Sequence, residues 1–192
     1  MSVKESYRFA SEADAAALLA IYAAYLDTGI TFETVLPDEE EFRARIREIS
    51  AEYPYLVCER EGRIVGYAYA HRVFARAAYR WDAELSVYLA PEARGEGLGE
   101  RLYRRLIALL RLQGVQTVYA VVTSPNPASD RLHARMGFVR EGYFRNSGYK
   151  NGVWYAVSWY ALPIGGYEDP PAELRGIGEI PPRDREAALA GG

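Results

Sequence analysis

The stretch from Glu84 to Gly99, which reads ELSVYLAPEARGEGLG, decides the fold. Its opening part alternates polar and apolar side chains, which predicts a β-strand over Glu84–Leu89. Pro91 follows the end of this strand. The run from Leu98 to Gln113 then places apolar residues at helical spacing, which predicts an amphipathic helix. A glycine-rich loop therefore joins a strand to the N-terminus of a helix.

The glycines of this loop suit an anion-binding turn. Gly95, Gly97 and Gly99 have no Cβ atom, so the backbone can adopt positive φ and approach a ligand closely. Free N–H groups and the helix dipole at the following N-terminus favour a phosphate. An ordinary strand-to-helix connection is the alternative. A Walker loop is excluded because the Lys-Ser/Thr ending is missing, and the spacing does not fit a dinucleotide-binding fingerprint.

The composition indicates a single globular domain. The chain has 192 residues, of which 49% are hydrophobic, and a net charge of -3, which gives no electrostatic reason to expect a nucleic-acid or membrane partner. The only cysteine, Cys58, excludes an internal disulfide and is expected to be a buried thiol. The two histidines have no ligand cluster around them, so we expect no metal. No apolar signal or membrane-spanning stretch is present, so we expect a soluble cytoplasmic protein.

The remaining pattern predicts an α/β domain with a mixed sheet. Its order is βααββ followed by βαβαββ, provided that Tyr7 to Phe9 form a first strand. The expected elements are helices at Ala15–Leu26 and from Pro37, a hairpin of Tyr55–Glu59 and Ile64–Val73, a strand at Thr117–Thr123, a helix at Asn126–Met136, and strands at Phe138–Tyr143 and Val153–Ala161. We divide the chain into a domain over 1–162 and a tail over 163–192. The tail is rich in Pro, Gly and charge, so we expect it to be irregular, with only a weak helical pattern at Arg183–Ala190.

Several motifs resemble a known enzyme family. RGEGLG resembles the R/Q-x-x-G-x-G/A loop of the GNAT-type N-acetyltransferase superfamily, which holds the pyrophosphate of acetyl-coenzyme A. Other motifs, in chain order, are similar to the phosphinothricin N-acetyltransferase-like branch of that superfamily. These are IY and TFE (Ile21, Tyr22, Thr31–Glu33), YPYLV (Tyr53–Val57), GYAYA (Gly66–Ala70), RAAYRW (Arg76–Trp81), ELSVYL, PNPASDRLHARMGF (Pro125–Phe138) and GYKNGVW (Gly148–Trp154).

This resemblance covers about residues 5 to 162 and implies the GNAT fold, a mixed and mostly antiparallel sheet flanked by helices. It also implies acetyl-CoA as the cosubstrate. By the same resemblance, the adjacent strand would diverge near Val87, and the backbone N–H of Val87 or a neighbour would then stabilise the thioester oxygen. Asn126 would bind the pantetheine arm; a turn or N-cap role is the alternative for Asn126. The implied cofactor-binding residues are Val87, Leu89, Arg94, Gly95, Gly97, Leu98, Gly99, Asn126 and Ser129.

Two residues are implied as catalytic. Glu84 stands where the family places a glutamate base, because an ammonium group must lose a proton before it attacks. It lies three residues before Val87, about 10 Å at about 3.3 Å per residue, which favours transfer through a bridging water. The alternative is an ion pair with Arg76 or Arg80. His133 occupies the position of a residue that protonates the leaving thiolate, and a positioning role is the alternative.

The acceptor pocket is implied by further family positions. Arg76 and Tyr79 match residues that bind the acid group of an amino-acid-like substrate, and an arginine fork suits a carboxylate or phosphinate. Phe32, Glu33, Lys150 and Trp154 belong to motifs that line the pocket, partly across a homodimer interface. Their alternatives are core packing for Phe32 and Trp154 and a solvated turn for Lys150. Arg80 departs from the family pattern and adds charge.

The sequence therefore favours an N-acetyltransferase that transfers acetyl directly, in a ternary complex, to the amine of a small amino acid or analogue. Phosphinothricin and methionine sulfoximine are the acceptors that the family name suggests. Two alternatives stay open, an enzyme that acetylates peptide or protein N-termini and a non-catalytic acetyl-CoA-binding module.

Overall fold

The fold is organised around a seven-stranded sheet, seen in a computed structural model that describes residues 4–191. The strand order is β1-β2-β3-β4-β5-β7-β6, and of the paired neighbours only β4 and β5 run parallel. This confirms the expected mixed, mostly antiparallel sheet. The strands are β1 (Glu5–Phe9), β2 (Tyr55–Arg60), β3 (Arg63–Arg72), β4 (Asp82–Leu89), β5 (Thr117–Ser124), β6 (Val139–Lys150) and β7 (Val153–Pro163).

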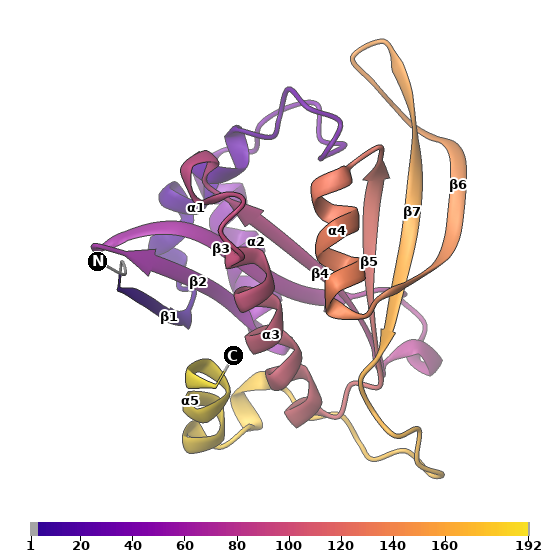
Figure 1. The fold of residues 1–192 in the computed structure, drawn as a ribbon. Coiled ribbons are helices and arrows are strands. Elements are labelled where there is room, and N and C mark those ends of the chain that lie inside the picture. Colours follow the sequence, from indigo (N-terminus) through magenta and orange to yellow (C-terminus); the bar gives the residue numbers. More distant parts are fainter. Residues whose placement is uncertain (1–3, 192) are drawn as a thin grey trace.

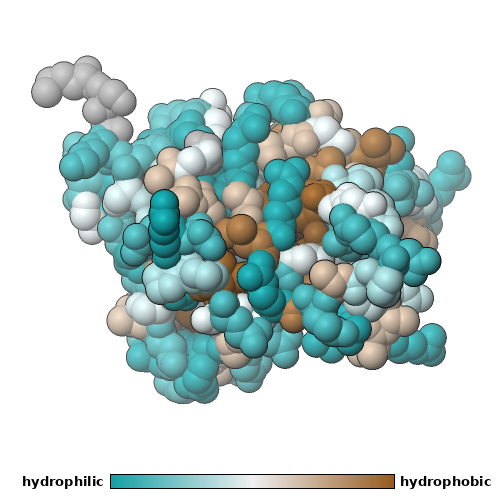
Figure 2. Space-filling view, turned by 90° about the horizontal axis from the view of Figure 1, so that it is seen from below, coloured by the Kyte–Doolittle hydropathy of each residue, from teal (hydrophilic) through white to brown (hydrophobic). Residues whose placement is uncertain are grey.

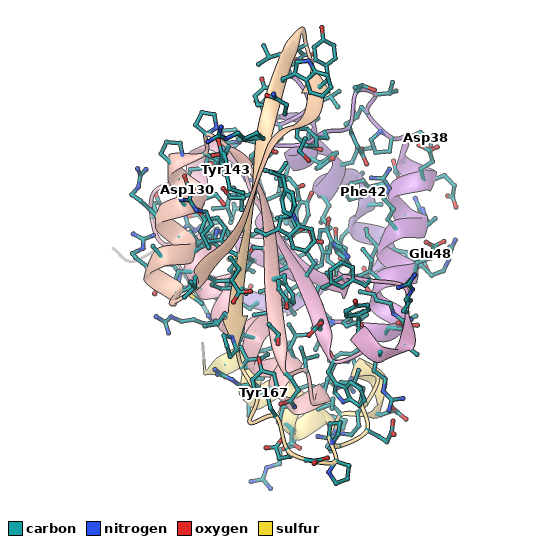
Figure 3. The ribbon with its side chains drawn as sticks, turned by 90° about the vertical axis from the view of Figure 1, so that its right-hand side faces the viewer. Asp38, Phe42, Glu48, Asp130, Tyr143 and Tyr167 are labelled. Atoms are coloured by element: carbon teal, nitrogen blue, oxygen red, sulfur yellow. The ribbon has the colours of Figure 1, made fainter. Side chains whose placement is uncertain are left out.

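Helices cover both faces of this sheet (Figure 1). The first face packs against α1 (Ala15–Ala23) and α2 (Glu39–Glu52), with Phe42 pointing from α2 toward the sheet and Glu48 pointing away (Figure 3). The other face packs against α3, α4 and α5, which span Leu98–Gln113, Pro127–Met136 and Pro182–Ala190. The two hydrophobic cores therefore lie on opposite sides of the central strands.

The helix after the glycine loop, α3, has the bounds that the sequence predicts. Gly97 precedes it with φ 77°, and Gly114 ends it with φ 94°, both in the left-handed region that glycine adopts without strain. Leu98, Leu102 and Leu106 are fully buried against the sheet. Burying one such side chain stabilises the fold by about 1.5–3 kcal/mol, which explains why this amphipathic stripe fixes the helix.

The parallel pair at the centre of the sheet is short. Strands β4 and β5 pair only over Asp82–Glu84 and Thr117–Tyr119, and the rest of β4 has no partner on that side within the described residues. In Figure 1 the two strands run together at one end and separate toward the other. The separation was expected from the family resemblance, and it leaves a gap in the middle of the sheet.

The second half of the sheet is longer than predicted. Strand β6 continues to Lys150 instead of ending at Tyr143, and its pairing with β7 shifts register twice. These bulges hide the alternation of side chains, because each one moves later residues to the opposite face. The β6–β7 hairpin consequently extends well beyond the other strands (Figures 1 and 3).

The C-terminal segment folds back along the base of the sheet, where we expected irregular chain. It contains the helix α5 and a short 3-10 turn at Ile177–Glu179. The Trp81 indole donates to Ala172 O at 2.8 Å, and Arg80 pairs with Glu173 at 3.0 Å. Figure 3 shows Tyr167 at the end of the molecule opposite the hairpin tip, and Figure 2 shows the largely hydrophilic lower face, with hydrophobic residues gathered near its centre.

None of the helices in residues 4–191 is long and apolar enough to cross a membrane. Within the same residues, no group of three His, Cys, Asp or Glu side chains is arranged to hold a metal ion. Cys58 is fully buried, as expected, and burial raises the pKa of its thiol to about 11.

Candidate active site

The gap between β4 and β5 exposes backbone groups of β4. Ala90 N, just after β4, donates to Val65 O of β3 at 2.9 Å. This bond fixes which alternate residues of β4 point their N–H groups toward β3. Because hydrogen-bonded and non-bonded pairs alternate in antiparallel strands, Tyr88, Ser86 and Glu84 direct their N–H groups at β3. Val87 then directs its N–H into the gap, beyond the last β4–β5 pair. The Val87 N–H is therefore a backbone donor that can take a carbonyl oxygen as its partner.

The neighbouring donor on β4 is already used. Leu89 N donates to the Tyr25 hydroxyl at 3.0 Å, and the same hydroxyl donates to Leu89 O at 2.7 Å. Arg94 stacks on the Tyr25 ring with its guanidinium carbon 4.5 Å from the ring centre. Leu89 therefore contributes its side chain to the core rather than a free N–H to the gap.

Glu84 lies at the narrow end of the gap. Neither Arg76 nor Arg80 pairs with it, so the expected alternative partners are wrong; Arg80 pairs with Glu173 in the tail. His71 of β3 lies opposite Glu84 instead, with Nε2 3.9 Å from Glu84 Oε1. Burial raises the pKa of Glu84, and the charge of His71 partly opposes this. The carboxyl group is thus a stronger base than an exposed glutamate.

The glycine loop lies at the wide end of the gap, before α3. Gly95 and Gly97 have φ near 80°. A Cβ atom at Gly95 would meet nothing within 4 Å, so its conformation, not its surroundings, requires glycine. No side chain caps α3, which leaves the first N–H groups of the helix free for an anion. Gly99 lies where an added Cβ would approach Leu132 of α4 at 3.4 Å.

An ion-pair network holds this loop against the sheet. Arg60 of β2 pairs with Glu96 of the loop at 2.6 Å and with Glu5 of β1 at 2.7 Å. Arg101 of α3 pairs with the same Glu5 at 2.8 Å and donates to Glu96 O at 2.9 Å. Burial favours the neutral form of Glu5, but its hydrogen bonds outweigh that effect and lower its pKa to about 2. The loop is therefore fixed by charged groups from β1, β2 and α3.

The helix α4 borders the gap beside β5. Asn126 is its N-cap, and its Oδ1 accepts from Ser129 N at 3.2 Å, which supports the capping alternative while leaving the amide NH₂ group for a ligand. His133 is 2% exposed and stacks on Tyr160, with ring centres 5.2 Å apart. Its Nδ1 lies 2.8 Å from Ser129 O, so this nitrogen carries the proton and Nε2 holds a lone pair. Burial lowers the pKa of His133, so the ring is neutral near pH 7.

The loop between α1 and α2 carries two of the predicted acceptor residues. Glu33 Oε1 pairs with Arg45 of α2 at 2.6 Å, while its Oε2 is buried without a hydrogen-bond partner in the described part of the chain. Phe32 is 40% exposed, so core packing is the wrong alternative for it. Its ring lies against Gly148 of β6 so closely that no side chain fits there.

Lys150 is buried, so the alternative of a solvated turn residue is wrong. Its side chain is at the end of β6, and Nζ donates to Leu26 O at 2.5 Å and to Thr31 O at 2.7 Å. Burial lowers the pKa of this amine. Lys150 thus fastens the β6–β7 hairpin to the loop that carries Phe32 and Glu33.

The other predicted acceptor residues are open to solvent. Arg76 and Tyr79 lie in the connection from β3 to β4, where Tyr79 packs on Phe74 with ring centres 4.7 Å apart. Trp154 is 60% exposed on the hairpin, beside Tyr149, so it is not a core aromatic. The structure therefore brings Phe32 and Lys150 together through β6 but leaves Trp154 on an outer surface.

Sequence reasoning missed Tyr25, His71 and Arg45. Their positions depend on the register of β3 with β4 and on how α1 and α2 pack, and neither is encoded in a local motif. For His71 no signal was available, because the predicted hairpin pairs its strand with Tyr55–Glu59 and not with the strand of Glu84.

Comparison with known proteins agrees with this geometry. The model of the acetyltransferase (GNAT) domain family matches residues 7–159. The chain belongs to the GNAT acetyltransferase family and is an N-acetyltransferase by that membership.

Its relatives define a branch of the family. A phosphinothricin N-acetyltransferase of Alcaligenes faecalis is 46% identical over 140 residues, 70% of each chain. An L-methionine sulfoximine/L-methionine sulfone acetyltransferase of Salmonella typhimurium is 34% identical over 86% of this chain and 98% of its own. The crystal structure of a phosphinothricin acetyltransferase from Sinorhizobium meliloti, in complex with AcCoA, superposes with TM-score 0.83 at 32% identity and covers 93% of this chain and 96% of that one. This chain is therefore similar to phosphinothricin N-acetyltransferases.

Proposed function

We propose that the chain transfers the acetyl group of acetyl-CoA directly to the amino group of a small amino acid or analogue of the phosphinothricin or methionine sulfoximine type. The observation that carries this proposal is the gap between β4 and β5, with the Val87 N–H inside it, Glu84 at one end and the glycine loop at the other. The names of the relatives support the class of acceptor.

The residues present fit acetyl-CoA. The free N–H groups at the start of α3 and the open space at Gly95 suit a pyrophosphate. The unpaired backbone groups of β4 suit the amides of the pantetheine arm. The NH₂ group of Asn126 is also free to donate to this arm. When bound, acetyl-CoA supplies an activated acetyl thioester. Leu98, Gly99 and Ser129 belong to the elements that would enclose it.

The chain's own groups perform the remaining tasks. Val87 N–H donates to the thioester oxygen as negative charge develops on it, a contribution typically worth about 2.7–4 kcal/mol for one such donor. Glu84 takes the amine proton through a water molecule, since the two positions are about 10 Å apart along the strand. The raised pKa of Glu84 favours this proton transfer.

In this mechanism His133 is a positioning residue and not the acid that protonates the thiolate. In its neutral form Nδ1–H donates to Ser129 O, so Nε2 has no proton to give to a leaving thiolate. A thiolate with a pKa of about 8.5 leaves without strong acid assistance. His133 therefore supports the wall of the gap through its contacts with Tyr103, Phe138 and Tyr160.

For the acceptor, we assign Arg76 and Tyr79 to the acid group and Phe32 and Glu33 to the pocket wall. The unpartnered Oε2 of Glu33 is a ready acceptor for an ammonium group. Lys150 contributes indirectly, because its hydrogen bond to Thr31 O holds the loop that carries Phe32 and Glu33.

We also propose a homodimer formed through the β6–β7 hairpin. Strand β6 is an edge strand, and the hairpin exposes large apolar side chains: Val139, Tyr143, Phe144, Tyr149, Val153 and Trp154. Exposed apolar surface on an edge strand favours association with a second copy of the chain.

The test is acetylation of a panel of amines, followed by mass spectrometry of the product. The panel contains phosphinothricin, methionine sulfoximine, methionine sulfone, ordinary amino acids and peptides with free N-termini. We expect saturable N-acetylation of an amino-acid analogue and a loss of about 10²-fold or more in kcat for E84Q. Preferred acetylation of peptides would replace this proposal with the peptide-acetylating alternative, and acetyl-CoA binding without turnover on any amine would replace it with the non-catalytic one.

A further inference from the structure

His71 faces the proposed base across the sheet. His71 of β3 and Glu84 of β4 are directly opposite in antiparallel register, so their side chains project from the same face. The distance from His71 Nε2 to Glu84 Oε1 is 3.9 Å. The site therefore holds a second titratable group beside the carboxylate to which we assign the proton transfer.

The orientation of the His71 ring suits it to receive a proton. Nδ1 lies 3.1 Å from Arg72 O, and a carbonyl oxygen can only accept, so Nδ1 carries the ring proton. In the neutral ring the lone pair is then on Nε2, the nitrogen nearer Glu84. Proton transfer requires the two atoms to approach from 3.9 Å to hydrogen-bond distance.

The difference in exposure between the two side chains favours proton transfer from Glu84 toward His71. The Glu84 side chain is 21% exposed and that of His71 is 36% exposed, so His71 is the group nearer to bulk water. Tyr69 of β3 packs beside His71, and Tyr103 of α3 lies near enough to feel the Glu84 charge. Burial raises the pKa of both tyrosines, to about 12 for Tyr69, so both stay neutral. Arg45 of α2 forms its ion pair with Glu33 and not with Glu84.

We propose that His71 is a positioning and proton-transfer residue that acts through Glu84 and passes to solvent the proton that Glu84 receives from the acceptor amine. This inference rests on the proposed function. In the step, the O–H bond of protonated Glu84 breaks as an N–H bond forms at His71 Nε2, which restores the carboxylate and gives an imidazolium. The imidazolium then releases that proton to buffer, and the pair returns to its starting state.

The pKa directions agree with this geometry. Burial keeps the pKa of Glu84 raised, which improves it as a base but slows the release of its proton to water. The Nε2 lone pair of His71, 3.9 Å from Glu84 Oε1, offers this proton an acceptor inside the site.

The experiment compares H71Q and H71A with wild type. Glutamine keeps a polar side chain of similar length without a titrating nitrogen, and alanine leaves a cavity that an added imidazole can fill. We expect kcat/KM for the amine to fall about tenfold in both, while KM for acetyl-CoA stays unchanged. This is less than the roughly 10²–10⁴-fold typical of a direct general base, because Glu84 still takes the proton. Imidazole should restore H71A but not H71Q, and substituted imidazoles should restore it in order of their basicity.

A double variant tests whether His71 acts through Glu84. H71A combined with E84Q should be no slower than E84Q alone, because residues that work as a unit are not additive. Full activity of H71Q and H71A, additive losses, or a loss that imidazole does not repair would overturn the His71 proposal while the wild-type enzyme remains active. A wild-type enzyme that acetylates no amine would instead overturn the proposed function, and the transfer role of His71 with it.

Discussion

A single buried imidazole makes the stability of this protein sensitive to pH. His133 is enclosed by Tyr103, Phe138 and Tyr160, and burial lowers its pKa below the usual value of about 6.5. The unfolded chain therefore binds a proton at a pH at which the folded chain does not. Stability from this residue is complete above about pH 6.5 and is lost as the pH falls below it.

The change H133F removes the titrating group and keeps an aromatic ring in its place. We expect the free energy of unfolding of wild type to decrease between pH 7.5 and 5 by at most about 1.4 kcal/mol per pH unit from this group. The decrease should be smaller in H133F, as measured by urea denaturation at each pH. Glu5 and Asp14, both with pKa lowered to about 2, contribute only in more acidic solutions and serve as an internal control. Equal slopes for the two proteins would contradict this explanation.

At the level of residues, the sequence predicted what a local motif encodes. Glu84 could be placed at the start of a strand and Asn126 ahead of a helix, because both lie in continuous patterned segments. His71 and Tyr25 could not be assigned a role, because their contacts join segments distant in the chain. The burial of Lys150 was also hidden, because a lysine in a turn motif is usually solvated.

Among the elements, the glycine loop before α3 gives a direct test of cofactor binding. Gly95 and Gly62 have φ of 80° and 76°, and an added Cβ atom at either would meet nothing within 4 Å. G95A and G62A should each cost about 1–2 kcal/mol of stability, since both place alanine in the left-handed region. Only G95A should raise KM for acetyl-CoA, because Gly62 lies in the β2–β3 turn.

Thermal denaturation and steady-state kinetics on the two variants supply the measurement. An equal change in KM for acetyl-CoA in G95A and G62A would mean that the effect comes from general destabilisation rather than from the loop.

The sequence predicted most helices and strands, but its pattern did not predict that β4 and β5 separate. The strand β4 has the apolar alternation of any buried strand, and nothing in it distinguishes paired from unpaired residues on the β5 side. The separation followed only from the family resemblance. The end of β6 was missed because its two register shifts interrupt the pattern on which strand prediction depends.

For the whole molecule, the C-terminal segment acts as a strap across the base of the sheet. Part of its anchoring comes from main-chain groups: Gln113 donates to Arg175 O at 2.8 Å, and Arg105 donates to Leu189 O at 2.7 Å. Its few apolar side chains supply the rest, since Ile177 and Ile180 are buried in the core. Main-chain contacts and isolated apolar residues produce no apolar periodicity in the segment itself. This explains why composition alone suggested an irregular tail.

The proposed homodimer makes a prediction at the same scale. Replacing Val139 and Tyr143 together by aspartate puts charge on the exposed hairpin of β6, and we expect it to convert the dimer into a monomer. Tyr167, which is 58% exposed at the end of the molecule opposite the hairpin tip (Figure 3), provides the control Y167D. Light scattering should give twice 21.6 kDa for wild type and Y167D and 21.6 kDa for the double variant. A monomeric wild type, or a double variant that stays dimeric, would contradict the assignment.

The decisive measurement is the initial rate of thiol release with acetyl-CoA and phosphinothricin both varied. Direct transfer in the gap between β4 and β5 requires both substrates to be bound together, so double-reciprocal plots should give lines that intersect. Parallel lines would show that an acetylated enzyme forms first, and they would contradict direct transfer to the amine.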